Sequence, residues 1–113
     1  MLQAMDPDAI TDYSLPDDIE NPSVFHLRTL SGRQYARVVR LMDTDADGRI
    51  VRVTPEAATE ALVQGLRGWS NFPAEWDKRD PLRNVDRLDD AAFAALSRKI
   101  LQLATLPEDQ AGK

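Results

Sequence analysis

The strongest constraint on the fold is an apolar stripe that begins after Asp89. Its members recur at alternating steps of three and four residues, at Phe93, Leu96, Ile100 and Leu103. Because an α-helix turns once in 3.6 residues, this spacing places them on one helical face. Asp89 can serve as the N-cap, and Leu88 can pack on Phe93 as a hydrophobic staple. The pattern predicts a helix from Asp89 to about Thr105.

Two earlier segments also have helical patterns. After Ser31 and Gly32, apolar residues occur at i, i+3, i+4 and i+7, at Tyr35, Val38, Val39 and Met42. Thr54-Pro55-Glu56 is typical of a helix start, because it offers a capping hydroxyl, a proline at the first helical position and an acidic residue in the first turn. The stripe that follows runs from Ala58 to Trp69, and Gly68 and Asn71 mark its end. We therefore expect a helix over most of 55–69.

Two short segments alternate in the manner of strands. In the first, Phe25 and Leu27 face one side, and Val24, His26 and Arg28 face the other. The segment 50–53 also alternates, so it can pair with the first segment. The stretch 72–87 contains two prolines and many charges without periodicity, which indicates a long loop.

Together these elements predict a mainly α fold, a small single domain of three helices with a short two-stranded β element. Length supports one domain, since the chain has 113 residues. We expect an acidic flexible arm over 1–22, the helical domain over 23–106 and a polar tail over 107–113, where Pro107 ends the last helix.

The charge is unevenly distributed between arm and domain. The net charge is -5. Residues 1–22 carry aspartates and a glutamate but neither Lys nor Arg, so the remaining chain is close to neutral. Prolines and few large apolar residues favour an arm that is mobile or ordered only by a partner. On this interpretation, deleting residues 1–22 leaves the fold intact.

Composition argues against several functions. The chain has no cysteine, which excludes disulfides, thiolate nucleophiles and Cys-based metal sites. His26 is the only imidazole, and no serine lies in a G-x-S-x-G elbow or has an identifiable base. We therefore expect no enzyme activity and no cofactor. No segment has the pattern of a signal peptide or membrane span, so the cytoplasm is the expected location.

One segment resembles a calcium loop. Residues 43–50 match the first eight positions of an EF-hand, with carboxylates at Asp43, Asp45 and Asp47 and a glycine at position 48. The match then fails, because the position that needs a bidentate Glu is Thr54. A tight turn uses the same residue types for local reasons, and we favour that interpretation.

Two further groups are candidate binding residues. Arg33, Arg37 and Arg40 lie on one helical face that can contact phosphates or an acidic segment. Because the domain is not basic overall, nucleic acid is not an expected partner. The second group lies at and beyond the end of the second helix and consists of Leu66, Trp69, Phe72 and Trp76. These residues are candidates for partner binding, although Trp69 can instead anchor the core.

The order of these segments resembles a known family. The entry F-x-L-x-x-L-S-G-R at 25–33, the helix end G-L-x-G-W-x-N-F at 65–72 and the acidic finish at 106–109 are similar to the tail assembly chaperones of long-tailed bacteriophages and prophages. The similarity covers roughly residues 13–110. None of these motifs is a chemical signature.

The resemblance implies a non-enzymatic chaperone. Such a protein binds the tape measure protein and recruits tail tube subunits during tail assembly, and family members often also have a longer form made by ribosomal frameshifting. We expect residues 66–78 and the apolar stripe of the last helix to contribute to the partner surface. A small calcium-binding module and a small adaptor protein remain the alternatives.

Overall fold

The computed structural model describes residues 9–111, with side chains described for residues 9–104. Within that part the chain forms the elements β1 (Ile10–Tyr13), β2 (Val24–Arg28), α1 (Gly32–Arg40), β3 (Asp43–Thr44), β4 (Ile50–Arg52), α2 (Pro55–Gly65), β5 (Leu66–Ser70), α3 (Pro81–Val85) and α4 (Asp90–Ala111). No helix in the described part is long and apolar enough to cross a membrane.

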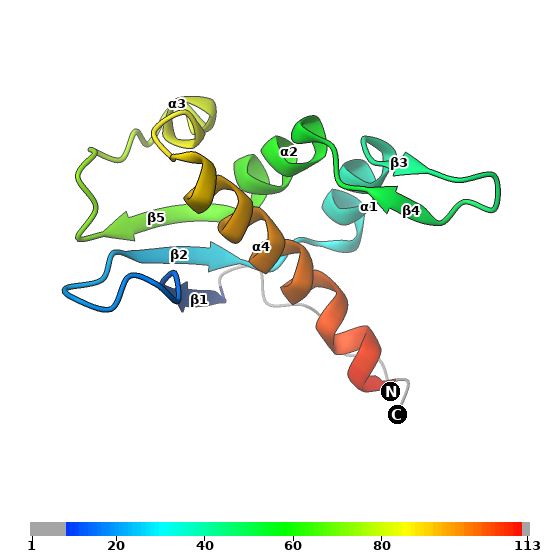
Figure 1. Ribbon diagram of the computed structural model, residues 1–113, viewed down its shortest axis with the longest axis horizontal. Helices are drawn as coiled ribbons and strands as arrows, with labels where there is room; N and C mark the ends of the chain where they lie inside the picture. Colours follow the sequence, from blue (N-terminus) through cyan, green and yellow to red (C-terminus); the bar gives the residue numbers. More distant parts are fainter. Residues whose placement is uncertain (1–8, 112–113) are drawn as a thin grey trace.

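The elements form two layers. Strands β1, β2 and β5 make an antiparallel sheet in the order β1-β2-β5. Helices α2 and α4 pack on one face of this sheet, and α1 packs beside α2 (Figure 1). The separate β3–β4 hairpin projects away from the main sheet (Figure 1).

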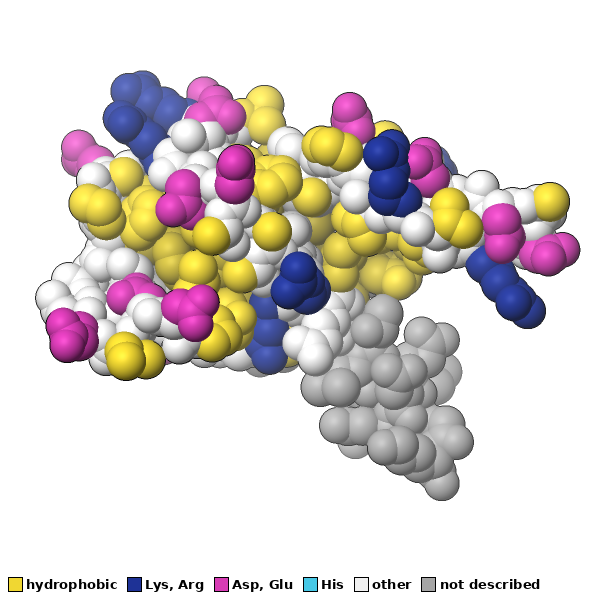
Figure 2. Space-filling model, viewed as in Figure 1, with side chains coloured by type: hydrophobic (Ala, Val, Ile, Leu, Met, Phe, Trp, Pro, Cys, Tyr) yellow, Lys and Arg dark blue, Asp and Glu magenta, His cyan; other side chains and the backbone are white. Residues whose placement is uncertain are grey.

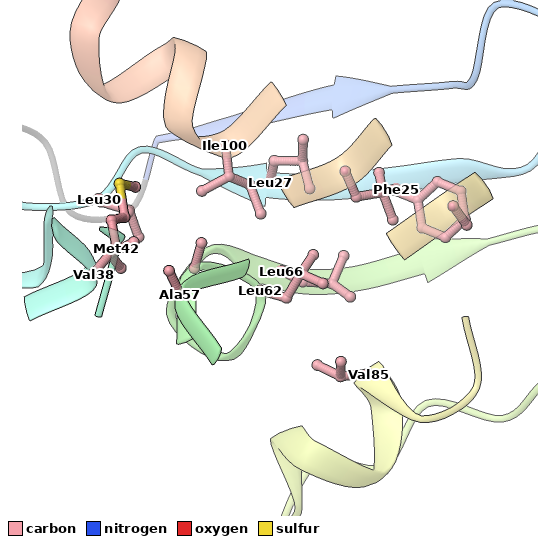
Figure 3. Packing of buried hydrophobic residues seen from close by; sticks show 13 residues of the cluster. Phe25, Leu27, Leu30, Val38, Met42, Ala57, Leu62, Leu66, Val85 and Ile100 are labelled. Carbon is pink, nitrogen blue, oxygen red and sulfur yellow. The ribbon is translucent and has the colours of Figure 1, made fainter. Parts of the chain in front are cut away.

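The core lies between the sheet and the two helices (Figure 3). Phe25 and Leu27 point from β2 toward the helices, as the alternation in the sequence predicts. They meet side chains of α2 and α4 that are at most 1% exposed, among them Leu62, Leu96 and Ile100. The apolar stripe after Asp89 therefore contributes to the core, and Asp89 accepts a hydrogen bond from the amide of Ala92 as predicted for an N-cap.

The prediction of a mainly α fold is wrong, because the chain is a mixed α/β domain with a three-stranded sheet. The largest error concerns residues 66–70, which the helical spacing of Leu62, Leu66 and Trp69 assigned to the second helix. The helix ends instead at Gly65, and Leu66 adopts an extended conformation. This segment pairs with β2, and the pairing satisfies the hydrogen bonds of its backbone N–H and C=O groups. The spacing of apolar residues within the segment does not reveal this stabilisation.

The predicted pairing of residues 50–53 with the first strand is also wrong. Strand β2 lies between β1 and β5, so both of its edges are occupied. Residues 50–52 pair instead with 43–44. The turn between them is closed by the carboxylate of Asp45, which accepts hydrogen bonds from the amides of Asp47 and Arg49 at 2.9 Å each.

Residues 9–22 contain part of the fold, so the boundary predicted at residue 22 needs correction. Residues 10–13 form the edge strand β1, and both Tyr13 and Leu15 pack against the core. The Lys99 ammonium of α4 lies 5.5 Å from the centre of the Tyr13 ring. Asp12 within β1 is exposed, so its charge is compatible with an edge strand.

Two details at the C-terminal side also differ from the sequence-based prediction. The predicted loop 72–87 contains the short helix α3, capped by Asp80 and started by Pro81. The last helix continues past Pro107 to Ala111, where we expected a polar tail. Proline removes one amide donor and crowds the carbonyl four residues earlier, which is why the sequence-based prediction ended the helix there.

Substitution of Gly65 tests the close approach of α2 and α4. A Cβ at this position would lie 2.7 Å from Cγ2 of Ile100 and 3.0 Å from its Cδ1. We expect Gly65→Ala to lower the free energy of unfolding by about 1–2 kcal/mol, because overpacking outweighs the better helix propensity of alanine. Urea unfolding measures the change. Gly32→Ala is the matched control, since a Cβ there meets nothing within 4 Å; equal stability of the two variants would contradict the prediction.

Candidate functional site

An apolar groove lies between the start of α2 and the middle of α4. Its volume is about 440 Å³, and its lining comes from the end of the hairpin and the two helices: Val53, Thr54, Pro55, Ala58, Phe93, Ala94, Ser97, Arg98 and Leu101. Figure 2 shows apolar side chains gathered between α4 and the hairpin. The volume is within the range of pockets that bind ligands or partner side chains.

The apolar surface extends from the groove onto the hairpin. Val53 at the groove is 46% exposed, and Val51 two residues earlier is 62% exposed. Residues two apart in an extended segment lie on the same side. A partner that covers these side chains would gain free energy, because binding removes their apolar area from water.

The aromatic residues predicted to bind a partner belong largely to the core. Trp69 and Phe72 lie 4.7 Å apart between ring centres, and Trp69 and Trp76 lie 4.8 Å apart. Phe25 contacts the same cluster, and the indole N–H of Trp69 donates to the carbonyl of Ala74 at 2.7 Å. The rings of Trp69, Phe72 and Trp76 are half-buried, and that of Phe25 is buried. A joint alanine substitution of the three predicted aromatics would therefore change stability as well as binding.

The other predicted partner residues divide by exposure. Leu66 is 3% exposed and belongs to the core, so it cannot contact a partner in this conformation. Arg33, Arg37 and Arg40 are all exposed on α1. Arg37 lies 4.0 Å from the carboxylate of Glu60, a contact too long and too exposed to neutralise the row. The three arginines form a basic face apart from the groove lining.

Two of the three aspartates in the segment that resembles a calcium loop are engaged in the hairpin. Asp43 forms an ion pair with Arg52 at 2.8 Å, and Asp45 accepts two amide hydrogen bonds in the turn. Among the described residues, the structure places no three carboxylate or imidazole side chains so that they could hold a metal ion together. Asp47 therefore belongs to no such group. Thr54, at the twelfth loop position, donates its hydroxyl to the carbonyl of Leu41 at 2.6 Å and caps α2. The geometry favours the turn interpretation.

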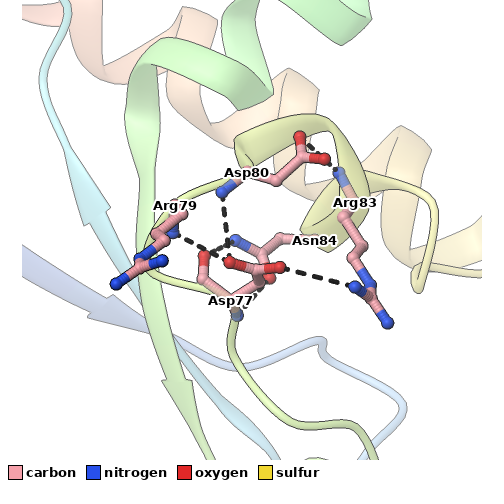
Figure 4. A network of polar contacts seen from close by, with 5 residues as sticks. All are labelled: Asp77, Arg79, Asp80, Arg83 and Asn84. Atoms are coloured by element: carbon pink, nitrogen blue, oxygen red, sulfur yellow. Dashed lines mark hydrogen bonds and ion pairs between the residues drawn. The ribbon is translucent and has the colours of Figure 1, made fainter.

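A polar network fixes the segment between β5 and α3 (Figure 4). The side-chain oxygen of Asn84 accepts from the amide of Asp77 at 2.7 Å, and its side-chain nitrogen donates to the carbonyl of Asp77 at 2.7 Å. Asn84 is only 1% exposed. The carboxylate of Asp77 accepts in turn from the amides of Arg79 and Asp80. Two hydrogen bonds from the buried side chain of Asn84 thus hold Trp76 and its neighbours near the core.

Sequence reasoning missed one cluster on the opposite face of the sheet. His26 lies on β2 between Asp12 of β1 and Ser70 of β5, and both contact its ring. The sequence separations are 14 and 44 residues, so no local motif connects them. The alternation of β2 does place His26 on the side away from the core. In the sequence, this alternation was the only sign that His26 could contact polar groups of neighbouring strands.

The motifs that carry the family resemblance are explained by the fold. In the entry motif, Phe25, Leu27 and Leu30 are buried, and Ser31 forms a capping box with Gln34. In the second motif, Asn71 adopts a positive φ of 56° and donates to the carbonyls of Asn21 and Pro22. These residues shape the domain. No family model, curated protein or solved structure matches the chain, so its function is argued from its own residues.

Proposed function

We propose that the chain is a phage tail assembly chaperone that binds the tape measure protein in the α2–α4 groove and recruits tail tube subunits. The role needs neither a cofactor nor a membrane. Two things support it: the resemblance of the three sequence motifs, and the exposed apolar groove that continues onto the hairpin. The single observation on which the proposal depends is this groove.

The shape and chemistry of the groove suit an amphipathic helix. An elongated helical protein presents apolar side chains at i, i+3, i+4 and i+7, and these can enter a groove between two helices. Phe93 and Leu101 provide apolar walls, while Arg98 supplies a positive charge beside them. We therefore expect the bound segment to carry acidic residues next to its apolar stripe.

Binding is tested by co-expression with the tape measure protein. Ala94 is exposed and lies in the second turn of α4, so Ala94→Arg puts a charge into the groove without removing core volume. We expect at least about a tenfold loss of co-purified partner, because an unpaired charge is costly to bury in an apolar site. Circular dichroism checks that the variant folds.

Ala36→Arg is the matched control. It makes the same substitution at an exposed position of α1 that does not line the groove. If the Ala94→Arg variant retained the tape measure protein fully, or if both variants lost it equally, binding in the groove would be contradicted. Retention of an unrelated helical protein by the wild type, with no retention of the tape measure protein, would favour the adaptor alternative.

A further inference from the structure

Three polar side chains form a chain across the face of the sheet that lies opposite the helices. The Nδ1 atom of His26 lies 2.7 Å from the carboxylate of Asp12, and its Nε2 atom lies 3.1 Å from the hydroxyl of Ser70. The sheet register fixes this arrangement, because Asp12 is the direct cross-strand partner of His26 and Ser70 is the partner of Val24. Each side chain comes from a different strand.

The partners determine which ring nitrogen carries the proton. An ionised carboxylate only accepts hydrogen bonds, so Nδ1 donates to Asp12. Nε2 of the neutral ring then holds a lone pair and accepts the hydroxyl proton of Ser70. An acid that orients a histidine, and a histidine that accepts a serine proton, are the elements of a Ser-His-Asp triad.

The cluster is open to a reactant. His26 is 32% exposed and Asp12 is 65% exposed, and Ser70 also faces solvent. Gly68 is the cross-strand partner of His26, and a Cβ there would lie 3.2 Å from Cδ2 of the ring. Glycine therefore leaves the space through which the ring reaches Ser70.

The strand that carries Ser70 also offers hydrogen-bond donors. Among the described strands β5 is at an edge of the sheet, so alternate backbone N–H groups along it point away from β2. Donors of this kind stabilise the oxyanion that forms when a serine attacks a carbonyl group. Because the cluster is open to solvent, the class of reactant we expect is an activated ester, whose good leaving group makes an enclosed pocket unnecessary.

We propose that Ser70 is a nucleophile that His26 and Asp12 activate toward activated acyl esters. Ser70 Oγ forms a bond to the carbonyl carbon while its proton passes to Nε2 of His26. The bond from that carbon to the leaving oxygen then breaks, and the leaving alcohol takes the proton from His26. Ser70 is left as an acyl ester, and water releases the acid by the same steps. This reactivity goes beyond the proposed chaperone function and does not depend on it.

The test treats the full chain with p-nitrophenyl acetate and, separately, with a fluorophosphonate probe. Peptide mass spectrometry should locate the label on Ser70, and Ser70→Ala should abolish it. Because a general base contributes about 10²–10⁴-fold, His26→Gln should slow labelling of Ser70 by at least about a hundredfold. Asp12→Asn should also slow it, since the ring then loses its orienting charge.

Ser23 is the internal control, because its hydroxyl donates to the carbonyl of Asn71 at 2.6 Å and has no histidine beside it. Ser23 should stay unlabelled. In the Ser23→Ala variant, Ser70 should be labelled at the same rate as in the wild type. Circular dichroism confirms that each variant is folded. Labelling of Ser70 that is unchanged in a folded His26→Gln variant, or no faster than labelling of Ser23, would overturn the proposal and leave the cluster a structural link between strands.

Discussion

Deletion of residues 1–22 is expected to lower the free energy of unfolding by about 3 kcal/mol or more, since it removes two half-buried side chains that each contribute about 1–2 kcal/mol. These are Tyr13 and Leu15, which pack against the core. The deletion also removes strand β1 and leaves an edge of β2 unpaired. Urea unfolding followed by circular dichroism measures the loss.

Point substitutions separate packing from truncation. Joint replacement of Tyr13 and Leu15 by alanine should reproduce most of the loss, because it keeps the backbone of β1 and removes the buried groups. Ile19→Ala is the control from the same acidic segment, since Ile19 is 82% exposed; we expect a change within about 0.5 kcal/mol. A truncated chain as stable as the full chain would restore the interpretation of a detachable arm.

Replacement of Asn84 by leucine is expected to cost about 2–4 kcal/mol, because it leaves the amide and the carbonyl of Asp77 without their partners at about 1–3 kcal/mol each. Leucine has the same branched arrangement of side-chain heavy atoms and leaves no cavity, so the change reports on the lost hydrogen bonds rather than on a cavity. Chemical denaturation gives the free energy, and Trp fluorescence reports on the segment that contains Trp76.

Arg83→Ala is the comparison for Asn84. The Arg83 side chain is 66% exposed and lies 3.8 Å from the carboxylate of Asp77 (Figure 4), so we expect a loss of at most about 0.5 kcal/mol. If the two variants were equally stable, the buried amide would not be what holds this segment in place.

The candidate sites differ in how far the sequence could predict them. The apolar residues of the groove on α4, such as Phe93 and Leu101, belong to a helix that the sequence predicted. Their neighbour Val53 follows the hairpin, and no pattern in the sequence indicated that Val53 would lie beside α4. The sequence offered Trp69 and Phe72 as partner-binding residues, but both are half-buried and pack against the core.

By itself the sequence determined the elements that local spacing controls. The start of α4 at Asp90, the capped starts of α1 and α2, and the alternation of β2 all follow from caps and periodicity within one segment. The structure decided what depends on pairing between distant segments: the helix end at Gly65, the sheet order β1-β2-β5 and the meeting of Asp12, His26 and Ser70. A strand gains its hydrogen bonds from another part of the chain, so its partner cannot be read from its own residues.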